Sequence, residues 1–468
     1  MDQSRRVSKG PGTCPPEATT ARGLVTTWVA TRARRFPDLE PAPLATDGLE
    51  QRDAALAHAI AKAVAQRWLT LATVIQSRLN HPWEKLEPDV QGALLVGAAQ
   101  LLVLGRLPDH AVIHEAVAWI KAARPQAGPG AGGLVNAVLR QVAKLRERRL
   151  EHQLPLGYER NELPLPDGGR WRLTQAVFDG DPMCRLAQQT SHPPELLKRW
   201  VSRFGGRRTE QLAAHNLLWP PIIVAGVGGD GEGADDPGHL PPGCRPHEEP
   251  GFTLFEEDHD HLRQLLGDMP SARVQDPAAA AAAVSTRPLA PNLIIDVCAG
   301  KGTKTRQLAE LHPTARIVAS DTSRIKLATL REAFSGHHRV RVVSAGELRR
   351  FTGKADLVIL DVPCSNTGVL ARRVEARYRF NPRSLQRLVD LQRQIIVDSL
   401  GLLVGGGHIL YSTCSLEAEE NEQQANWITR WHPMEICRAK RRLPRGLPGD
   451  PPARYCDGGY FALLKRFE

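Results

Sequence analysis

The sequence IIDVCAGKGTKT, Ile294–Thr305, is the most informative motif for the fold of the C-terminal part of the chain. An apolar run ends at Asp296, glycines follow at Gly300 and Gly302, and a helix is predicted to come next. Glycines let the backbone approach a ligand closely, and the first N–H groups of a helix are free to bind it. Asp321 ends the next apolar run about 20 residues later, where an acid typically binds ribose hydroxyls. The pattern therefore predicts a site for a ligand that carries adenosine.

Five apolar runs of strand length alternate with helix-sized segments around this stretch. They are NLIIDV, RIVAS, RVRVV, LVILD and GHILYS, at residues 292–297, 316–320, 339–343, 357–361 and 407–412. Such alternation predicts an α/β domain over residues 291–468, with a parallel sheet and helices on both faces. A P-loop is excluded because the pattern GxxxxGK[ST] does not occur.

The rest of the chain divides by composition into four regions. Residues 1–20 are rich in Pro, Gly and Thr and are expected to be disordered. Apolar residues recur at three- and four-residue spacing through residues 21–150, which predicts an all-helical domain. Residues 151–184 are a predicted linker. Residues 185–290 are a predicted small mixed α+β subdomain with a low-complexity, disordered insertion at 228–251.

The overall composition favours a cytoplasmic protein with a nucleic acid partner. The chain has 468 residues and a net charge of +10, and a basic balance suits a polyanion. Its eight cysteines include no CxxC pair, so neither a disulfide framework nor a zinc site is predicted. His110 and His114 lie one helical turn apart without a third ligand, so no metal is expected there either. The polar start resembles no signal peptide, and the longest apolar run, residues 92–105, is too short to span a bilayer.

Two cysteines follow two of the predicted strands. Cys364 lies in LVILDVPCSNTG and Cys414 in GHILYSTCSLEAEEN. A metal pair, a disulfide, buried fillers and reactive thiols are the alternatives, and a lone cysteine is most often a filler. Ligands of parallel sheets bind at the carboxyl ends of the strands, so two cysteines at equivalent ends favour reactive thiols. Positive charge lowers a cysteine pKa, and Lys304 and the Arg372-Arg373 pair are the candidate charges.

Three motifs resemble those of the Sun family of RNA cytosine-5 methyltransferases. DVCAGKGTKT is similar to its cofactor loop, and LDVPCSNTGV and YSTCSLEAEEN to its two cysteine motifs. RLPDHAVIHEAVAWIKAA and GGLVNAVLRQV resemble the NusB-like RNA-binding domain of its bacterial 16S ribosomal RNA members. HPPELLKRWVSRFG and ARVQDPAAAAAAV resemble the family's intermediate RNA-recognition subdomain. The resemblance covers the chain from about residue 20. It implies a NusB-like all-α domain, a mixed subdomain and a Rossmann-like methyltransferase domain.

The resemblance also implies the chemistry and the residues that perform it. Cys414 is the implied nucleophile at C6 of the cytosine, and Cys364 is implied to assist release of the methylated RNA. Asp361 is implied to hold the base and Lys304 to orient these groups. S-adenosylmethionine is the implied methyl donor, without a metal, and 16S ribosomal RNA the implied partner of a monomeric protein. The implied cofactor-binding residues are Cys298, Ala299, Gly300, Lys301, Gly302, Thr303, Lys304, Asp321 and Asp361.

The chain departs from the family pattern at several positions. The family's loop usually reads Ala-Ala-Pro-Gly-Gly-Lys, whereas Lys301 and Thr303 replace a proline and a glycine here. Where the family commonly has Gly-Asp-Gly near the adenine, this chain offers only Glu347. A DNA cytosine-5 methyltransferase, with Cys364 as the nucleophile, and a non-catalytic RNA-binding or ribosome assembly factor are the alternatives. Transfer RNA is the alternative RNA substrate, and these residues do not specify which cytosine is modified.

Overall fold

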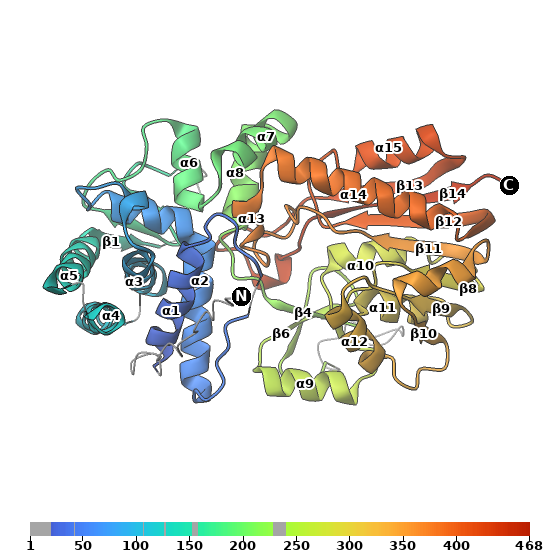
Figure 1. Ribbon diagram of the computed structural model, residues 1–468, viewed down its shortest axis with the longest axis horizontal. Helices are drawn as coiled ribbons and strands as arrows, with labels where there is room; N and C mark the ends of the chain where they lie inside the picture. Colours follow the sequence, from blue (N-terminus) through green and yellow to red (C-terminus); the bar gives the residue numbers. More distant parts are fainter. Residues whose placement is uncertain (1–19, 42, 106, 126–127, 152–157, 228–239) are drawn as a thin grey trace, which may run out of the picture. The chain divides into compact units, whose positions relative to one another are not determined.

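The computed structural model describes residues 20–41, 43–105, 107–125, 128–151, 158–227 and 240–468 (Figure 1). They divide into two compact units. The first runs to Leu165 and includes Gly169–Leu197, and the second comprises Pro166–Gly168 and Lys198–Glu468. The predicted disordered segment at residues 1–20 lies outside the described residues except for Thr20, which caps the first helix. No helix among the described residues is long and apolar enough to cross a membrane.

The first unit is built mainly from helices, as the apolar spacing predicts. They are α1 (Ala21–Ala33), α2 (Gln51–Gln76), α3 (Pro88–Ala99), α4 (Asp109–Ala123), α5 (Gly128–Lys144) and α6 (Pro182–Thr190). The central helix α3 packs against α1, α2, α4 and α5. A Cβ at Gly92 would lie 2.9 Å from the Cβ of Ala30, so α3 approaches α1 through a residue without a side chain.

The predicted linker at residues 151–184 is wrong for much of its length. Strand β1 (Arg146–Leu150) pairs antiparallel with β3 (Arg170–Leu173), which pairs antiparallel with β2 (Glu162–Pro164). Leu163 and Leu173 of this small sheet are buried. Strands of three to five residues rich in charge leave no apolar run to read, so the sequence pattern missed them.

The second unit begins with a smaller sheet of strand order β5-β6-β4-β7. These strands are β4 (Ile222–Ala225), β5 (Cys244–Pro246), β6 (Phe252–Phe255) and β7 (Arg273–Val274), with helices α8 (Gly206–His215) and α9 (His259–Asp268) in the same region. Helix α7 (Pro194–Phe204) comes before them. The predicted disordered insertion at 228–251 is wrong for its second half, because β5 pairs with β6. Residues 228–239 lie outside the described residues.

The larger sheet has seven strands in the order β10-β9-β8-β11-β12-β14-β13. The five predicted runs form β8 (Leu293–Asp296), β9 (Arg316–Ala319), β10 (Val340–Val342), β11 (Ala355–Asp361) and β12 (Leu403–Thr413), all parallel. That prediction is confirmed. Two further strands make the sheet mixed: β14 (Gly459–Arg466) pairs antiparallel with β12, and the edge strand β13 (Met434–Arg442) pairs antiparallel with β14.

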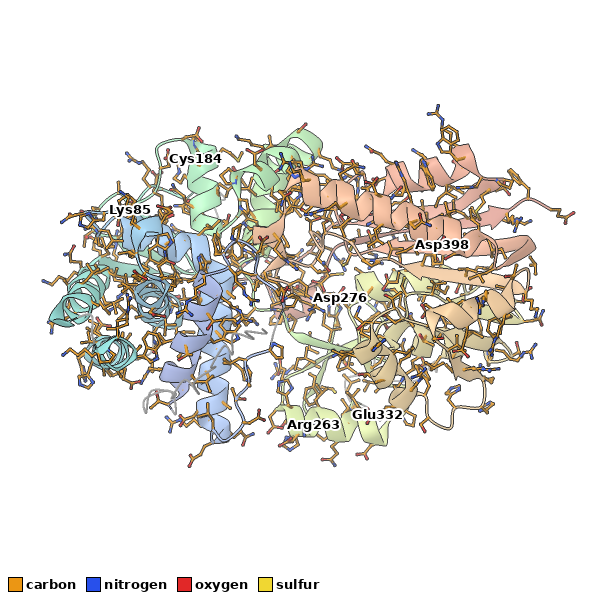
Figure 2. All side chains as sticks on the ribbon, in the orientation of Figure 1. Lys85, Cys184, Arg263, Asp276, Glu332 and Asp398 are labelled. Carbon is orange, nitrogen blue, oxygen red and sulfur yellow. The ribbon has the colours of Figure 1, made fainter. Side chains whose placement is uncertain are left out.

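Helices cover both faces of the larger sheet, as Figure 1 shows. They are α10 (Pro277–Val284), α11 (Thr303–Leu311), α12 (Arg324–Ala333), α14 (Pro382–Leu400) and α15 (Glu422–Trp431), and the short helix α13 (Ala376–Arg379) comes in the segment between β11 and α14. Ile295 packs in one core with residues of α14 and α15, and its neighbour Ile294 in the other with α10, α11 and α12. Outer side chains such as Glu332 and Asp398 are exposed (Figure 2). Because β8 to β12 run parallel, their carboxyl ends lie at one edge of the larger sheet.

Candidate active site

The glycine loop between β8 and α11 is held against the end of β9. Gly300 and Gly302 have φ angles of +60° and +90°, which glycine adopts without strain. A Cβ at Gly302 would lie 2.5 Å from the ring of Phe334, so the loop packs too closely for any other residue there. The N–H of Gly300 donates to Oδ2 of Asp321 at 3.0 Å. The predicted glycine turn and the predicted ribose-binding acid are thus in direct contact.

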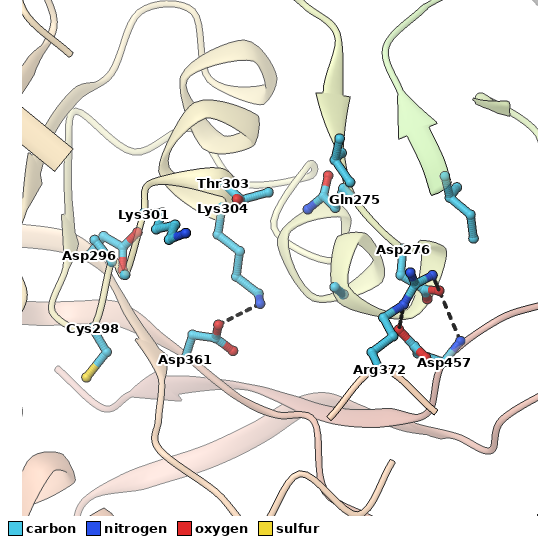
Figure 3. A pocket seen from close by; sticks show the side chains of 15 residues that line it. Gln275, Asp276, Asp296, Cys298, Lys301, Thr303, Lys304, Asp361, Arg372 and Asp457 are labelled. Carbon is cyan, nitrogen blue, oxygen red and sulfur yellow. Dashed lines mark hydrogen bonds and ion pairs between the residues drawn. The ribbon is translucent and has the colours of Figure 1, made fainter. Parts of the chain in front are cut away.

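A cavity of about 350 Å³ lies in front of this loop (Figure 3). Most of the predicted site residues line it, namely Cys298, Ala299, Gly300, Lys301, Thr303, Lys304 and Asp361. The other lining residues are Ile223, Val274, Gln275, Asp276, Ala279, Asp296, Arg372 and Asp457. Gly302, Asp321, Cys364 and Cys414 do not line the cavity. Asp321 is joined to it through its hydrogen bond with Gly300.

Asp296 is a feature of the cavity that the sequence pattern did not single out. Its side chain is 1% exposed, and Oδ2 accepts a hydrogen bond from the Thr305 hydroxyl at 2.6 Å. Its other oxygen, Oδ1, has no hydrogen-bond partner among the described residues. Burial raises the pKa of Asp296 to about 7. A buried acceptor without a partner at a cavity wall is a place where a ligand can donate a hydrogen bond.

Lys304 and Asp361 form an ion pair at the carboxyl end of β11. Nζ of Lys304 lies 2.7 Å from Oδ2 of Asp361 (Figure 3). The Ser412 hydroxyl donates to Oδ1 of Asp361 at 2.8 Å. Burial lowers the pKa of Lys304, but the Asp361 carboxylate, together with the charges of Cys414 and Asp296, raises the pKa above its ordinary value. Lys304 is therefore a stable cation at the edge of the cavity.

The structure brings the two predicted cysteines together. Sγ of Cys364 lies 3.1 Å from Sγ of Cys414, at the ends of the adjacent strands β11 and β12. Sγ of Cys414 also lies 3.1 Å from Oδ1 of Asn366, whose amide donates to the Cys364 carbonyl at 2.8 Å. Asn366 has a φ of +61°, so the loop bends sharply around the pair. By contrast, burial raises the pKa of Cys298 to about 12, which leaves that thiol protonated and unreactive.

The expectation that Arg372 supplies charge to the cysteines is wrong. Its Nε lies 2.7 Å from Oδ2 of Asp457, and its Nη2 lies 3.5 Å from Oδ2 of Asp276. Two carboxylates therefore neutralise this guanidinium at the other side of the cavity (Figure 3). Lys304 is the cation that interacts with Cys414, because the charge of Cys414 contributes to raising the pKa of Lys304.

Glu347 has a local role in the structure. Its Oε2 accepts hydrogen bonds from the Ser344 amide at 2.9 Å and the Ser344 hydroxyl at 2.7 Å. The pair forms a capping box at the start of the 3₁₀-helix Ala345–Phe351. The same bonds lower the pKa of Glu347. This carboxylate is occupied by its own chain and does not line the cavity.

Comparisons with known proteins agree along most of the chain. The family model for 16S rRNA methyltransferase RsmB/F matches residues 284–445, and that for the NusB family matches residues 31–144. The chain is 30% identical over 353 residues to the ribosomal RNA small subunit methyltransferase B of Shewanella oneidensis. The aligned part covers 74% of this chain and 74% of the relative. It is 27% identical over 441 residues to the protein of that name from Erwinia tasmaniensis, covering 90% of this chain and 92% of the relative. The crystal structure of PH0851 has the same fold, with a TM-score of 0.69 at 19% identity over 95% of this chain and 99% of that chain.

Proposed function

Because the chain belongs to the RsmB/F family of 16S rRNA methyltransferases, we propose that it transfers a methyl group from S-adenosylmethionine to C5 of a cytosine in 16S ribosomal RNA. The observation that carries the proposal is the pair of sulfur atoms, Cys364 and Cys414, 3.1 Å apart on adjacent strand ends. Methylation at a ring carbon needs a nucleophile that adds to the ring, whereas methylation at oxygen or nitrogen does not. A thiol pair in the same domain as the Lys304–Asp361 ion pair supports methylation at a ring carbon.

The residues around the glycine loop fit the methyl donor. Gly300 and Gly302 let the backbone approach it, and the first N–H groups of α11 face the same region. Asp321 would bind the ribose hydroxyls, and the unpartnered Oδ1 of Asp296 would accept from the donor's amino group. When bound, S-adenosylmethionine supplies an electrophilic methyl group.

Cys414 performs the first step of the proposed reaction. Its thiolate forms a bond between Sγ and C6 of the cytosine, and the electron pair of the C5–C6 double bond becomes available at C5. The cation Lys304 stabilises the thiolate before it adds. Asp361 accepts a hydrogen bond from the exocyclic amine, so the base stays oriented while the negative charge of the thiolate passes into its ring. C5 can then take the methyl group.

Cys364 acts in the second step, which restores the aromatic ring. The proton on C5 passes to water, its electron pair re-forms the C5–C6 double bond, and the bond between C6 and Sγ of Cys414 breaks. The sulfur of Cys414 leaves as a thiolate. Cys364 lies within hydrogen-bond distance of that sulfur and donates its S–H proton as a hydrogen bond to it, which stabilises the leaving group.

Asp321→Ala is expected to weaken S-adenosylmethionine binding by about 1–3 kcal/mol, because ribose hydroxyls lose hydrogen bonds to a charged acceptor. Titration calorimetry measures this loss directly. Glu347→Ala is the matched control, since its carboxylate bonds only to its own segment, and it should bind the donor as the unaltered protein does. Unchanged affinity in Asp321→Ala would remove this residue from the site.

Bisulfite mapping tests the proposed function. Bisulfite converts cytosine to uracil but leaves 5-methylcytosine intact. RNA from cells without the gene should gain one convertible cytosine in 16S ribosomal RNA, and restoring the gene should protect it again. Protection in transfer RNA instead would make the substrate assignment wrong. Methylation detected by mass spectrometry at another atom would make the C5 assignment wrong.

A further inference from the structure

A buried carboxylate lies between the two loops that carry the cysteines. Glu420 is 0% exposed. Its Oε1 accepts hydrogen bonds from the Ser365 amide and from Nε2 of Gln392, both at 2.9 Å. Its Oε2 accepts from the hydroxyls of Ser365 and Ser415, both at 2.5 Å. One side chain thus receives four hydrogen bonds from three different segments.

Two of these donors, Ser365 and Ser415, are the residues next to the two cysteines. Ser365 directly follows Cys364, and Ser415 directly follows Cys414. We propose that Glu420 is a positioning residue of the methyl transfer, which fixes the distance between the two sulfur atoms and keeps the proton on Cys364. The inference rests on the proposed function, because it assigns different protonation states to the two thiols.

Glu420 is itself held by the core of the domain. The Tyr411 hydroxyl, on β12, donates to the Glu420 carbonyl at 2.6 Å. Gln392, on α14, also donates from Nε2 to the Pro363 carbonyl at 2.9 Å, one residue before Cys364. The Glu420 side chain therefore joins a helix and both cysteine loops, and its backbone carbonyl joins them to a strand. Removing the side chain would leave several buried donors without an acceptor, and such donors move or take up water.

The charges around the sulfur pair are asymmetric. Lys304 acts on Cys414, whereas the Glu420 carboxylate acts on Cys364. The hydrogen bond with Cys414, burial and the negative charges of Cys414 and Glu420 raise the pKa of the Cys364 thiol well above its ordinary value. Tyr411 also faces Cys364, and burial raises its pKa, so it stays neutral. The negative charge of Glu420 therefore favours the protonated thiol at Cys364.

The charge of Glu420 depends in turn on pH. Burial raises the pKa of Glu420, and the hydrogen bonds from Ser365, Ser415 and Gln392 oppose that rise without cancelling it. The carboxylate is charged above this raised pKa and takes a proton as the pH falls through it. In acid the anion beside Cys364 is therefore lost, together with its effect on the thiol.

Alkylation of each cysteine across a pH series distinguishes the effect of the Glu420 charge from the effect of its hydrogen bonds. Glu420→Gln keeps an acceptor for the Ser365 amide and Gln392 but removes the charge. The full chain is labelled with iodoacetamide at a series of pH values, and mass spectrometry gives the labelling rate of each cysteine. In Glu420→Gln, the midpoint for Cys364, the pH at which its labelling rate reaches half its maximum, should fall by on the order of one pH unit. Glu419→Gln is the matched control, because the neighbouring carboxylate pairs with Arg199 and touches neither loop. It should leave both midpoints in place.

Methylation kinetics test the positioning role. Glu420→Ala should lower kcat at least tenfold and leave the KM for S-adenosylmethionine unchanged, because the cofactor loop is untouched. Glu420→Gln should fall between Glu420→Ala and the unaltered protein, since it restores part of the hydrogen-bonding geometry. It also serves as the folded variant if the alanine protein does not fold.

The outcomes separate this inference from the proposed function. An unchanged Cys364 midpoint in Glu420→Gln would overturn the role of its charge, and an unchanged kcat in the folded variants would overturn the positioning role. If the unaltered protein makes no 5-methylcytosine, the proposed function fails. The labelling experiment still reads the charge effect in that case, because it needs neither RNA nor activity.

Discussion

Cys414→Ala is expected to reduce methyl transfer by on the order of 10⁴-fold or more, the scale of losing a covalent nucleophile. C5 of cytosine is too weak a nucleophile to take a methyl group unless a thiolate first adds at C6. Cys364 cannot take over this step, because its raised pKa keeps it protonated and its side chain is only 9% exposed. The rate of tritiated methyl transfer to a 16S ribosomal RNA transcript measures the loss.

Donor binding and a second cysteine provide the controls for this variant. Calorimetry should show unchanged affinity for S-adenosylmethionine, since Cys414 does not line the cavity at the glycine loop. Cys437 is an exposed cysteine on β13, and Cys437→Ala should be as active as the unaltered protein. Activity of Cys414→Ala within tenfold of the unaltered protein would exclude Cys414 as the nucleophile.

Lys304→Met is expected to lower kcat by about 10²–10³-fold, the usual cost of removing one charged group that stabilises a transition state. The substitution takes away the cation that acts on Cys414 and leaves the Asp361 carboxylate without its partner at 2.7 Å. Lys304→Arg keeps the charge and should recover part of the rate. Its planar guanidinium cannot take the place of a compact ammonium group completely.

A double-mutant cycle with Asp361→Asn checks whether the two residues act as a pair. If they do, the combined variant should lose much less than the product of the two single losses, because each change removes the same interaction. Independent losses that multiply would mean that Lys304 and Asp361 act separately. A Lys304→Met enzyme with an unchanged kcat would contradict a role for the cation in activating Cys414.

The sequence predicts best the parts of the site that depend on local pattern. The glycine loop could be predicted because positive φ angles at Gly300 and Gly302 require the residue type that the chain has there. The meeting of Cys364 and Cys414 could be predicted because parallel strands end at a common edge. Both inferences needed only the order of strands and the residues that follow them.

Contacts set by strand register could not be predicted. Asp361 lies opposite Ser412 in the pairing of β11 with β12, and this register gives Asp361 its second hydrogen bond. The role of Glu420 could not be predicted either, because the residues that donate hydrogen bonds to it lie 5 to 55 positions away in the sequence. The edge strand β13 was missed because seven successive residues after Met434 are exposed, which leaves no apolar run.

The two thiols have different roles in the proposed reaction, and detection of a covalent complex between protein and RNA distinguishes these roles. Each cysteine variant is incubated with S-adenosylmethionine and a 16S ribosomal RNA transcript and run on a denaturing gel under reducing conditions. Cys364→Ala should still add Cys414 to the base and accept the methyl group, but release should stall and a slow-migrating complex should accumulate. Cys414→Ala should form no complex. A complex with Cys414→Ala and none with Cys364→Ala would make Cys364 the nucleophile and contradict the account.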